Sequence, residues 1–490
     1  MFMDEYIPEL FFATSDKRVS EQQKRLRDEG RIKKVAPRLY SSVPEDKWPE
    51  VVRRNWALVV DNLFPGALLS YRSAMEFAPS SEGIIYITSG TTRTLFYPGL
   101  TVSFLRGPAP LDDDGCFLSD LRTSSLPRAC LENLRPLRNT NKKRVWPREQ
   151  LELRLEDLLR TNGEAFINSL RDRAKEIAED FGWPREFEKL NQILGALLGA
   201  CNPPRGSFPS VKARADGQPF DSRCLERLTS LFTYLKTTPL KSFKETRKDY
   251  NHFRNKAFFE SYFSNYIEGT TFDIEVAEHI VFDNNIPAER PQDAHDVLAT
   301  FQIVSDRNEM TQVPGSVSEL SALLVHRHGI IMDKRHDKSP GVFKKAVNRA
   351  GDTVFVPPEY VEGTLERGFL LYRSLDPGLQ RGIFIKFLVS EVHPFIDGNG
   401  RISRIMMNAE LSSSGLCTVI IPTVYREDYL LSLRALSRRM RPAPYLTMLS
   451  EAHRFSSHID FSDYPTALQA ITERNWFLEP DKGRIIYKKT

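Results

Sequence analysis

The strongest constraint on the fold of this chain is a short polar segment between two apolar stretches. Residues 393–404 read His-Pro-Phe-Ile-Asp-Gly-Asn-Gly-Arg-Ile-Ser-Arg. The apolar residues 383–392 precede this segment and 405–411 follow it, and both predict buried helices. The segment is therefore expected to form a loop that opens directly into the N-terminus of the second helix.

The residue types in this loop suit the binding of an anion at a helix start. Gly398 and Gly400 allow positive φ angles and close approach to the backbone. Free N–H groups and the helix dipole favour negative charge at such a position. Arg401 and Arg404 are three residues apart, so both project from one face of the first turn. Two arginines beside a glycine nest predict a polyphosphate site.

Two further residues of the loop add chemistry to this anion site. Asp397 offers a hard oxygen ligand for a Mg²⁺ ion that bridges the phosphates. His393, at the mouth of the loop, could accept a proton from an attacking hydroxyl. The alternative is a structural loop with a buried histidine, a glycine turn and solvated arginines. The joint occurrence of these residues in one short window favours the functional interpretation.

These residues resemble the signature HPFx(D/E)GNGRxxR of the Fic (filamentation induced by cAMP) family and match it at every position. The resemblance covers roughly residues 235–454 and implies an all-helical domain that transfers AMP from ATP to a protein hydroxyl. It implies that His393 is the general base and that Asp397 binds Mg²⁺. Gly398 and Gly400 match the nucleotide-transferring members and not the Doc-type kinases. The resemblance assigns the nucleotide phosphates to Gly398, Asn399, Gly400, Arg401 and Arg404, with Arg404 at the γ-phosphate, and it makes Phe395 a core anchor.

A second motif, at residues 264–269, resembles the inhibitory motif (S/T)xxxE(G/N) of the same family. Ser264 and Glu268 are four residues apart on a helix expected over about 250–268, so they share one face. Gly269 is expected to end that helix. A carboxylate that reached Arg404 would occupy the γ-phosphate position, and ATP would then bind unproductively. The alternative is an ordinary surface glutamate before a helix-ending glycine.

Residues 340–358 resemble the flap of the family, an element that pairs with the extended backbone of a target protein. Phe343 and the lysines 344–345 stand where other members often carry Tyr-Arg. A short strand is expected at 354–356. The alternative is a plain loop before a helix that begins at Glu359.

The N-terminal part carries a basic patch. Residues 17–38 hold nine basic and three acidic side chains, a local charge of +6 against +4 for the whole chain. A helix at 21–29, then Gly30 and a basic strand-turn-strand at 31–42, is typical of a winged helix-turn-helix. With residues 69–74 and the strands that follow, this region resembles the N-terminal part of AbiEi-type antitoxins, which are DNA-binding autorepressors of toxin–antitoxin systems. The candidate contacts to double-stranded DNA are Lys24, Arg25 and Arg27. The alternative is a solvated helix on a domain that contacts protein.

The length of 490 residues predicts about three domains. The expected fold is mainly α, with a small α+β winged-helix-like domain at 1–138 and a helical linker region at 139–234. The Fic domain with its inhibitory helix and a short β flap follows at 235–454, and a helical tail at 455–490. The polar residues 139–144 and the Pro- and Gly-rich residues 202–221 are the expected linkers.

Composition excludes several classes of protein. With 41% hydrophobic and 27% charged residues and no long uncharged apolar run, the chain is expected to be soluble, without a membrane span. Its start does not read as a secretion signal, and its five dispersed cysteines suggest reduced thiols in the cytoplasm and no zinc site. The histidines at 326, 328 and 336 are expected to be solvated.

The sequence therefore predicts a protein adenylyltransferase that uses ATP and Mg²⁺, modifies a protein substrate and itself, and is restrained by Glu268. Two alternatives stay open. One is a DNA-binding regulator whose Fic-like domain senses nucleotide. The other is an enzyme in which Glu268 positions a water to remove AMP from a modified protein.

Overall fold

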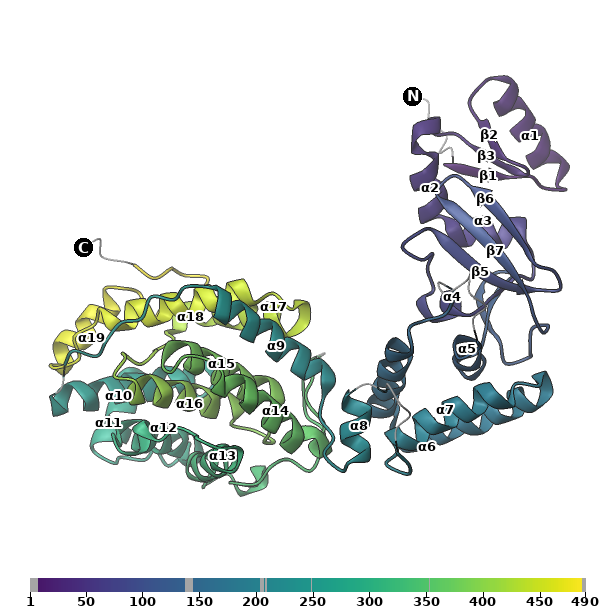
Figure 1. Ribbon diagram of the computed structural model, residues 1–490. Helices are drawn as coiled ribbons and strands as arrows, with labels where there is room; N and C mark the ends of the chain where they lie inside the picture. Colours follow the sequence, from purple (N-terminus) through teal and green to yellow (C-terminus); the bar gives the residue numbers. More distant parts are fainter. Residues whose placement is uncertain are drawn as a thin grey trace. The chain divides into compact units, whose positions relative to one another are not determined.

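The computed structural model describes residues 8–136, 144–202, 207, 209–247, 249–351 and 353–486. The chain forms two compact units, Met1–Gly217 and Gln218–Thr490 (Figure 1). Apart from Arg144, the linker predicted at 139–144 lies outside the described residues, as does the predicted boundary at 138/139. The finer division into four parts stays a prediction.

The N-terminal unit begins with a small antiparallel sheet of order β1-β3-β2. Along the chain, helix α1 (Lys17–Asp28) follows β1 (Leu10–Phe12) and precedes the hairpin of β2 (Lys33–Ala36) and β3 (Leu39–Ser41). The Asp16 side chain caps α1 by accepting hydrogen bonds from the N–H groups of Arg18 and Val19. The expected order of helix, Gly30 and basic hairpin is present, while the winged-helix assignment stays a prediction.

A six-stranded mixed sheet of order β6-β7-β5-β4-β9-β8 follows, and it confirms the α+β character expected for this region. Strands β5 and β7 pair in parallel, from Ile84 with Thr101 to Ser89 with Arg106. Val59, Val60, Ile87 and Val102 are fully buried in the core of this part. The elements are α2 (Trp48–Arg54), α3 (Trp56–Leu63), β4 (Leu68–Leu69), α4 (Arg72–Glu76), β5 (Ile84–Ser89), β6 (Arg93–Tyr97), β7 (Leu100–Arg106), β8 (Gly115–Leu118), β9 (Leu121–Thr123) and α5 (Leu126–Asn133).

Helices α6 (Arg148–Phe181), α7 (Pro184–Leu197) and α8 (Pro209–Ala215) complete the first unit. Helix α6 is interrupted at Gly163, whose φ is 82°. Helix α8 lies inside the stretch 202–221 that was expected to be only a linker, because Val211 is buried with the leucines of α6 and α7.

The second unit is helical apart from the antiparallel hairpin of β10 (Arg349–Ala350) and β11 (Thr353–Val354). Its helices are α9 (Ser222–Thr237), α10 (Tyr250–Ile267), α11 (Ile274–Phe282), α12 (Pro291–Ser305), α13 (Val317–Ile331), α14 (Val361–Arg373), α15 (Leu379–Val392), α16 (Asn399–Ser413), α17 (Arg426–Arg439), α18 (Pro442–Ser457) and α19 (Tyr464–Thr472). In the described part of the chain, no helix is both long enough and apolar enough to span a bilayer.

Helices α15 and α16 pair in the middle of this unit, between α17–α19 on one side and α11–α13 on the other (Figure 1). Their close approach depends on Gly382, where a Cβ atom would lie 3.2 Å from the carbonyl oxygen of Met407. Residues outside the predicted limits 235–454 also belong to this core. Helix α9 packs against α14 and α15, and the buried Trp476 packs against Phe263 and Phe455.

Candidate active site

The loop at 393–404 has the expected form, because α15 ends at Val392, directly before it, and α16 begins inside it at Asn399. His393 (φ 53°) and Gly398 (φ 74°) both have left-handed backbone conformations, which turn the chain from one helix into the next. A Cβ atom at Gly398 would also lie 3.0 Å from Sδ of Met332, so the position requires glycine for space as well as for conformation.

The buried side-chain amide of Asn399 holds this loop in shape. Its Oδ1 accepts a hydrogen bond from the Phe395 N–H (2.9 Å), and its Nδ2 donates to the Phe395 carbonyl (2.8 Å). The resemblance assigned Asn399 to the phosphates, whereas its amide contacts the backbone of its own loop. A phosphate contact by Asn399 therefore stays a prediction.

Arg404 meets the predicted inhibitory motif. Its Nε donates to Ser264 Oγ (2.9 Å), and its Nη2 donates to the Ser264 carbonyl (2.8 Å) and to Glu268 Oε1 (2.7 Å). Burial favours the neutral form of Arg404, but Glu268 and Tyr429 outweigh this effect and hold its pKa above the ordinary value. The spacing of Ser264 and Glu268 thus brings both to one guanidinium.

The Glu268 carboxylate lies over the first turn of α16. A Cβ atom at Gly400 would be 2.1 Å from Glu268 Oε1, so the carboxylate occupies the space that a side chain at Gly400 would fill. Gly269 (φ 91°) follows as the helix-ending glycine. A negative charge therefore already lies at the helix N-terminus that the loop sequence marked as an anion site.

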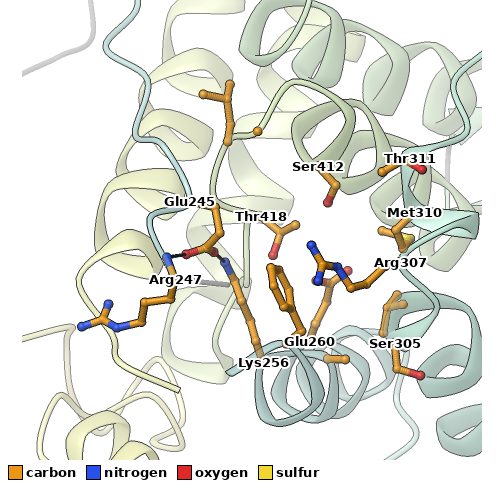
Figure 2. Close-up of a pocket in the computed structure, with 15 residues that line it drawn as sticks. Glu245, Arg247, Lys256, Glu260, Ser305, Arg307, Met310, Thr311, Ser412 and Thr418 are labelled. Carbon is orange, nitrogen blue, oxygen red and sulfur yellow. Dashed lines mark hydrogen bonds and ion pairs between the residues drawn. The ribbon is translucent and has the colours of Figure 1, made fainter. Parts of the chain in front are cut away.

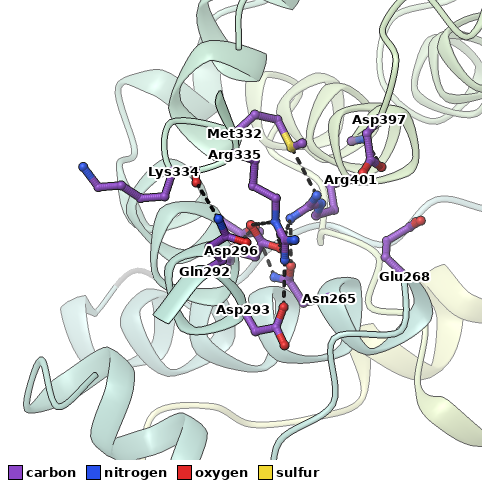
Figure 3. A network of polar contacts seen from close by, with 12 residues as sticks. Asn265, Glu268, Gln292, Asp293, Asp296, Met332, Lys334, Arg335, Asp397 and Arg401 are labelled. Carbon is purple, nitrogen blue, oxygen red and sulfur yellow. Dashed lines mark hydrogen bonds and ion pairs between the residues drawn. The ribbon is translucent and has the colours of Figure 1, made fainter. Parts of the chain in front are cut away.

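Arg401 forms a separate, more deeply buried network with α10 and α12 (Figure 3). Its Nη1 lies 3.0 Å from Asp296 Oδ2 and donates to Asn265 Oδ1 (3.4 Å). Arg335 also donates to Asp296, at 2.7 Å. Both loop arginines reach α10, at Asn265 and Ser264, which fits their predicted common face. Only Arg404 contacts Glu268.

His393 has a defined tautomer at the start of the loop. Its Nδ1 lies 3.3 Å from the Ser390 carbonyl and so carries the proton, which leaves Nε2 as the acceptor. Its ring stacks on Phe355 of the flap, with centroids 3.7 Å apart. Burial, the largest effect, lowers the pKa of His393 to about 4, so the imidazole is neutral at neutral pH.

The flap is tied to the loop at several points. The Lys344 N–H donates to the Pro394 carbonyl (2.9 Å), and Asn348 Nδ2 donates to the Phe395 carbonyl (2.8 Å). Phe343 packs against Phe395 with ring centroids 5.3 Å apart. Residues 343–344, where other members often carry Tyr-Arg, therefore contact the loop through the Phe343 ring and the Lys344 backbone.

Asp397 is the residue of the loop that could hold a metal ion. Its carboxylate is exposed, and its Oδ1 accepts a hydrogen bond from the Gly398 N–H (2.7 Å). In the part of the chain that the structure describes, no three His, Cys, Asp or Glu side chains cluster as a metal site. A single carboxylate beside an anion site fits Mg²⁺, which usually binds one or two carboxylates together with substrate phosphates.

His328 is a site residue that the sequence analysis missed. The expectation of a solvated side chain was wrong, because His328 lies on the buried face of α13 with Leu320 and Leu324. That spacing of four residues was the available signal. His326 and His336 are exposed, as expected.

The His328 ring joins the flap to the loop. It stacks on Phe395 with centroids 3.7 Å apart and an interplanar angle of 2°. Its Nδ1 accepts a hydrogen bond from the Gly341 N–H (2.9 Å), so Nε2 carries the proton and donates to the Asp397 carbonyl (3.1 Å). Burial lowers the pKa of His328 to about 4. One neutral tautomer therefore fixes the backbone beside the candidate metal ligand.

Comparison with known proteins finds similarity in the part of the chain that contains this loop. Residues 319–411, which include the loop, match the model of the Fic/DOC family. The protein adenylyltransferase Fic of Nematostella vectensis is 28% identical over 181 residues, which cover 36% of this chain and 42% of the relative. A Fido domain-containing protein of Dictyostelium discoideum is 28% identical over 136 residues, which cover 27% of this chain and 95% of the relative.

A further relative is the protein adenylyltransferase fic-1 of Caenorhabditis elegans, which is 25% identical over 42% of this chain and 44% of its own length. The chain thus spans less than half the length of two of these three relatives. The solved structure of C. elegans Fic-1 covers 67% of this chain and 95% of its own, with 18% identity and a TM-score of 0.36.

His328→Phe tests the two hydrogen bonds by which His328 connects the flap to the loop. The ring can still stack on Phe395, but the Gly341 N–H and the Asp397 carbonyl lose their partner. We expect the free energy of unfolding at neutral pH to fall by about 1–3 kcal/mol. Because the folded pKa lies below the unfolded one, the wild type loses this histidine's contribution as the pH falls from about 6.5 towards 4. The phenylalanine variant has no such loss. The difference in unfolding free energy between the wild type and His328→Phe therefore becomes smaller at acid pH.

Urea unfolding at several pH values measures both effects. His326→Phe is the matched control, because His326 is exposed on the same helix. Equal unfolding free energies for the two variants would contradict the assigned role of His328.

Proposed function

We propose that this chain is a protein adenylyltransferase that transfers AMP from ATP to a hydroxyl group of a protein and is restrained by Glu268. The observation that carries the proposal is the pairing of Arg404 with Ser264 and Glu268 at the N-terminus of α16. A neutral histidine and an exposed carboxylate stand in the same loop. The match of this segment to the Fic/DOC family and the names of its relatives support the same activity.

In the proposed reaction the ATP phosphates bind at the N-terminus of α16. The backbone around Gly398 and Gly400 and the guanidinium of Arg404 receive them. Mg²⁺, held by Asp397 and the phosphates, would neutralise part of their charge. Arg401 adds positive charge from behind the loop, where Asp296 holds it in place.

The chemical step needs one base and one leaving group. The hydroxyl oxygen of the target attacks the α-phosphorus of ATP, and His393 Nε2 takes the hydroxyl proton. The bond from the α-phosphorus to its bridging oxygen breaks, and pyrophosphate leaves with the electron pair. The product is a phosphodiester between AMP and the protein. The neutral state of His393 leaves its Nε2 lone pair ready for this role.

Inhibition follows from competition for Arg404. A γ-phosphate can pair with this guanidinium only after the Glu268 carboxylate has moved, since both are anions that use the same donors. The Glu268 side chain is 35% exposed, whereas that of Asp296, the partner of Arg401, is 2% exposed. Glu268 is therefore the carboxylate that can leave without opening the core.

The target is proposed to be a protein that adds a strand to the flap. The hairpin of β10 and β11 is short, and Phe355, which directly follows β11, stacks on His393. A backbone segment bound along this hairpin would bring its hydroxyl next to the base. Self-modification is proposed as a second outcome of the same chemistry.

The N-terminal unit supports a second proposal, the binding of double-stranded DNA. Helix α1 buries only Leu26, and Lys24, Arg25 and Arg27 are exposed. Their acidic neighbours pair with them weakly, at 3.4 Å for Arg25 with Glu29 and 3.9 Å for Arg27 with Asp28. Such exposed pairs contribute little free energy and are readily exchanged for phosphates.

His393→Ala tests the assigned base. We expect transfer of label from ATP to protein to fall by roughly 10²–10⁴-fold, because the hydroxyl proton loses its acceptor. ATP binding, measured by calorimetry, should be retained. The exposed His279 offers a control, His279→Ala, that should leave transfer unchanged. Transfer within a few-fold of the wild type in His393→Ala would refute the assignment.

Glu268→Gly tests the inhibitory carboxylate. We expect self-labelling with ATP to rise, because Arg404 becomes available to the γ-phosphate. Arg404→Ala should not reproduce the gain, since it removes the phosphate contact as well. Glu289→Gly, at an exposed turn, is the control for a glutamate-to-glycine change.

Unchanged self-labelling of Glu268→Gly at saturating ATP would contradict autoinhibition. The same variant also addresses the alternative in which the enzyme removes AMP. In that case Glu268→Gly would release AMP from a labelled protein more slowly than the wild type.

A charge reversal tests DNA binding by the full chain. We expect the change of Lys24, Arg25 and Arg27 to glutamate to abolish a gel shift of duplex DNA at low salt. Each lost phosphate contact should lower the log–log salt slope by about 0.9. Lys175→Glu, an exposed change on α6, should have little effect. Absence of any shift by the wild type would leave contact with protein as the role of α1.

A further inference from the structure

A cavity in the helical unit lies away from the loop, near the C-terminal end of α16 (Figure 2). It has a volume of about 180 Å³ and is lined by α10, the end of α12 and the segment that follows α16. Its apolar wall includes Phe253, Val304, Met310 and Leu416. The volume is below the roughly 300 Å³ at which pockets for drug-sized molecules begin, so it suits a small metabolite.

The buried charge of this cavity is the carboxyl group of Glu260. This residue is 8% exposed and forms no ion pair within 4 Å among the residues described. Burial raises the pKa of Glu260 to about 7 and outweighs the opposing effects of Asn408, Lys256, Thr418 and Arg404. A cation brought next to this carboxyl group would therefore gain a full ion pair.

The neighbouring Lys256 does not fill that role, because it is already paired. Its Nζ lies 2.7 Å from Glu245 Oε2, and the side chain is 5% exposed. Desolvation raises the pKa of Glu245, but His252 and Lys256 outweigh it and hold that pKa far below its ordinary value. The pair of Lys256 and Glu245 is thus neutral as a whole. Lys256 therefore does not neutralise Glu260.

Arg307 supplies the complementary charge at the rim. Its guanidinium lies 4.2 Å from the ring centroid of Phe253 and, among the described residues, makes no hydrogen bond or ion pair. Figure 2 shows Arg307 and Glu260 directed into the same space from different elements. The cavity therefore offers one carboxylate and one guanidinium, each without a partner of opposite charge, beside an apolar wall.

We propose that this cavity binds a small zwitterion, an α-amino acid with an apolar side chain. The ammonium group pairs with Glu260, the carboxylate pairs with Arg307, and the side chain packs against Phe253, Met310 and Leu416. A simple cation would leave Arg307 unpaired, and a simple anion would leave Glu260 unpaired. A zwitterion pairs with both groups and adds no net charge beside the buried Glu260.

The position of the cavity links it to Arg404. Glu260, Ser264 and Glu268 are spaced by four residues along α10 and its C-terminal end, so they lie on one face. A ligand that holds Glu260 fixes the helix that presents Ser264 and Glu268 to α16. Occupancy is then expected to strengthen inhibition, a consequence that rests on the proposed function.

Calorimetric titration of the full chain tests the site itself. The probes are L-leucine, leucinamide, which lacks the carboxylate, and 4-methylpentanoate, which lacks the ammonium group. At about pH 8, above the pKa of Glu260, L-leucine should bind and each analogue should bind at least about tenfold more weakly. L-methionine and L-phenylalanine extend the series in the size of the side chain.

Two variants remove the two charges of the site. Glu260→Gln and Arg307→Gln should each weaken L-leucine binding by about tenfold or more, while the exposed changes Glu289→Gln and Arg373→Gln should not. Arg307 is exposed at the rim, so its replacement is not expected to disturb folding. Arg307→Gln therefore still tests the site if Glu260→Gln fails to fold. Failure of all three amino acids to bind at millimolar concentration, or equal binding by both variants, would overturn the proposal.

The regulatory consequence has its own measurement. L-leucine should lower self-labelling of the wild type and leave that of Glu268→Gly unchanged. If L-leucine binds but does not change self-labelling of the wild type, the link to inhibition is refuted, while the binding site itself is supported. Because the titration needs neither ATP nor activity, failure of the site and failure of the proposed enzyme are distinguishable.

Discussion

The contact between Arg404 and the end of α10 is the interaction on which the site depends. A guanidinium buried at the start of α16 would cost several kcal/mol if it lacked partners. Ser264 supplies two acceptors and Glu268 supplies the opposite charge, so the protein itself pairs with the Nε and Nη2 groups of the guanidinium that is proposed to receive a phosphate. The same contact joins α10 to α16. A movement of α10 would therefore break the contact between Arg404 and Glu268 that is proposed to inhibit transfer.

The two arginines of the loop have different partners, and the difference in burial explains their different proposed roles. Arg401 is held by Asp296, which is almost completely buried and also pairs with Arg335. Breaking that network would leave charges uncompensated in the core. Arg404 is held by a carboxylate that is one third exposed. An incoming anion can displace Glu268 into water at modest cost, whereas it cannot displace Asp296.

The loop is held in shape by hydrogen bonds within it and from distant segments. Asn399 closes the loop on itself, His328 holds the Asp397 carbonyl, and Asn348 and Lys344 tie the flap to Phe395 and Pro394. Most of these contacts use a buried side chain to satisfy a backbone group, which removes alternatives for the loop conformation. The orientation of His393 then follows from its helix end and from the stacked Phe355.

The sequence by itself determined the features that depend on neighbouring residues. The loop between two apolar helices, the glycines with positive φ and the common face of Ser264 and Glu268 follow from local periodicity and backbone sterics. The partners of Arg401, the burial of His328 and the cavity around Glu260 could not be predicted in this way. Each of these three features depends on contacts between residues of different helices. A short polar pattern in the sequence does not reveal which helix face a distant segment will cover. Tertiary packing decided them, because only the folded core removes these side chains from water and makes each of them require a specific partner.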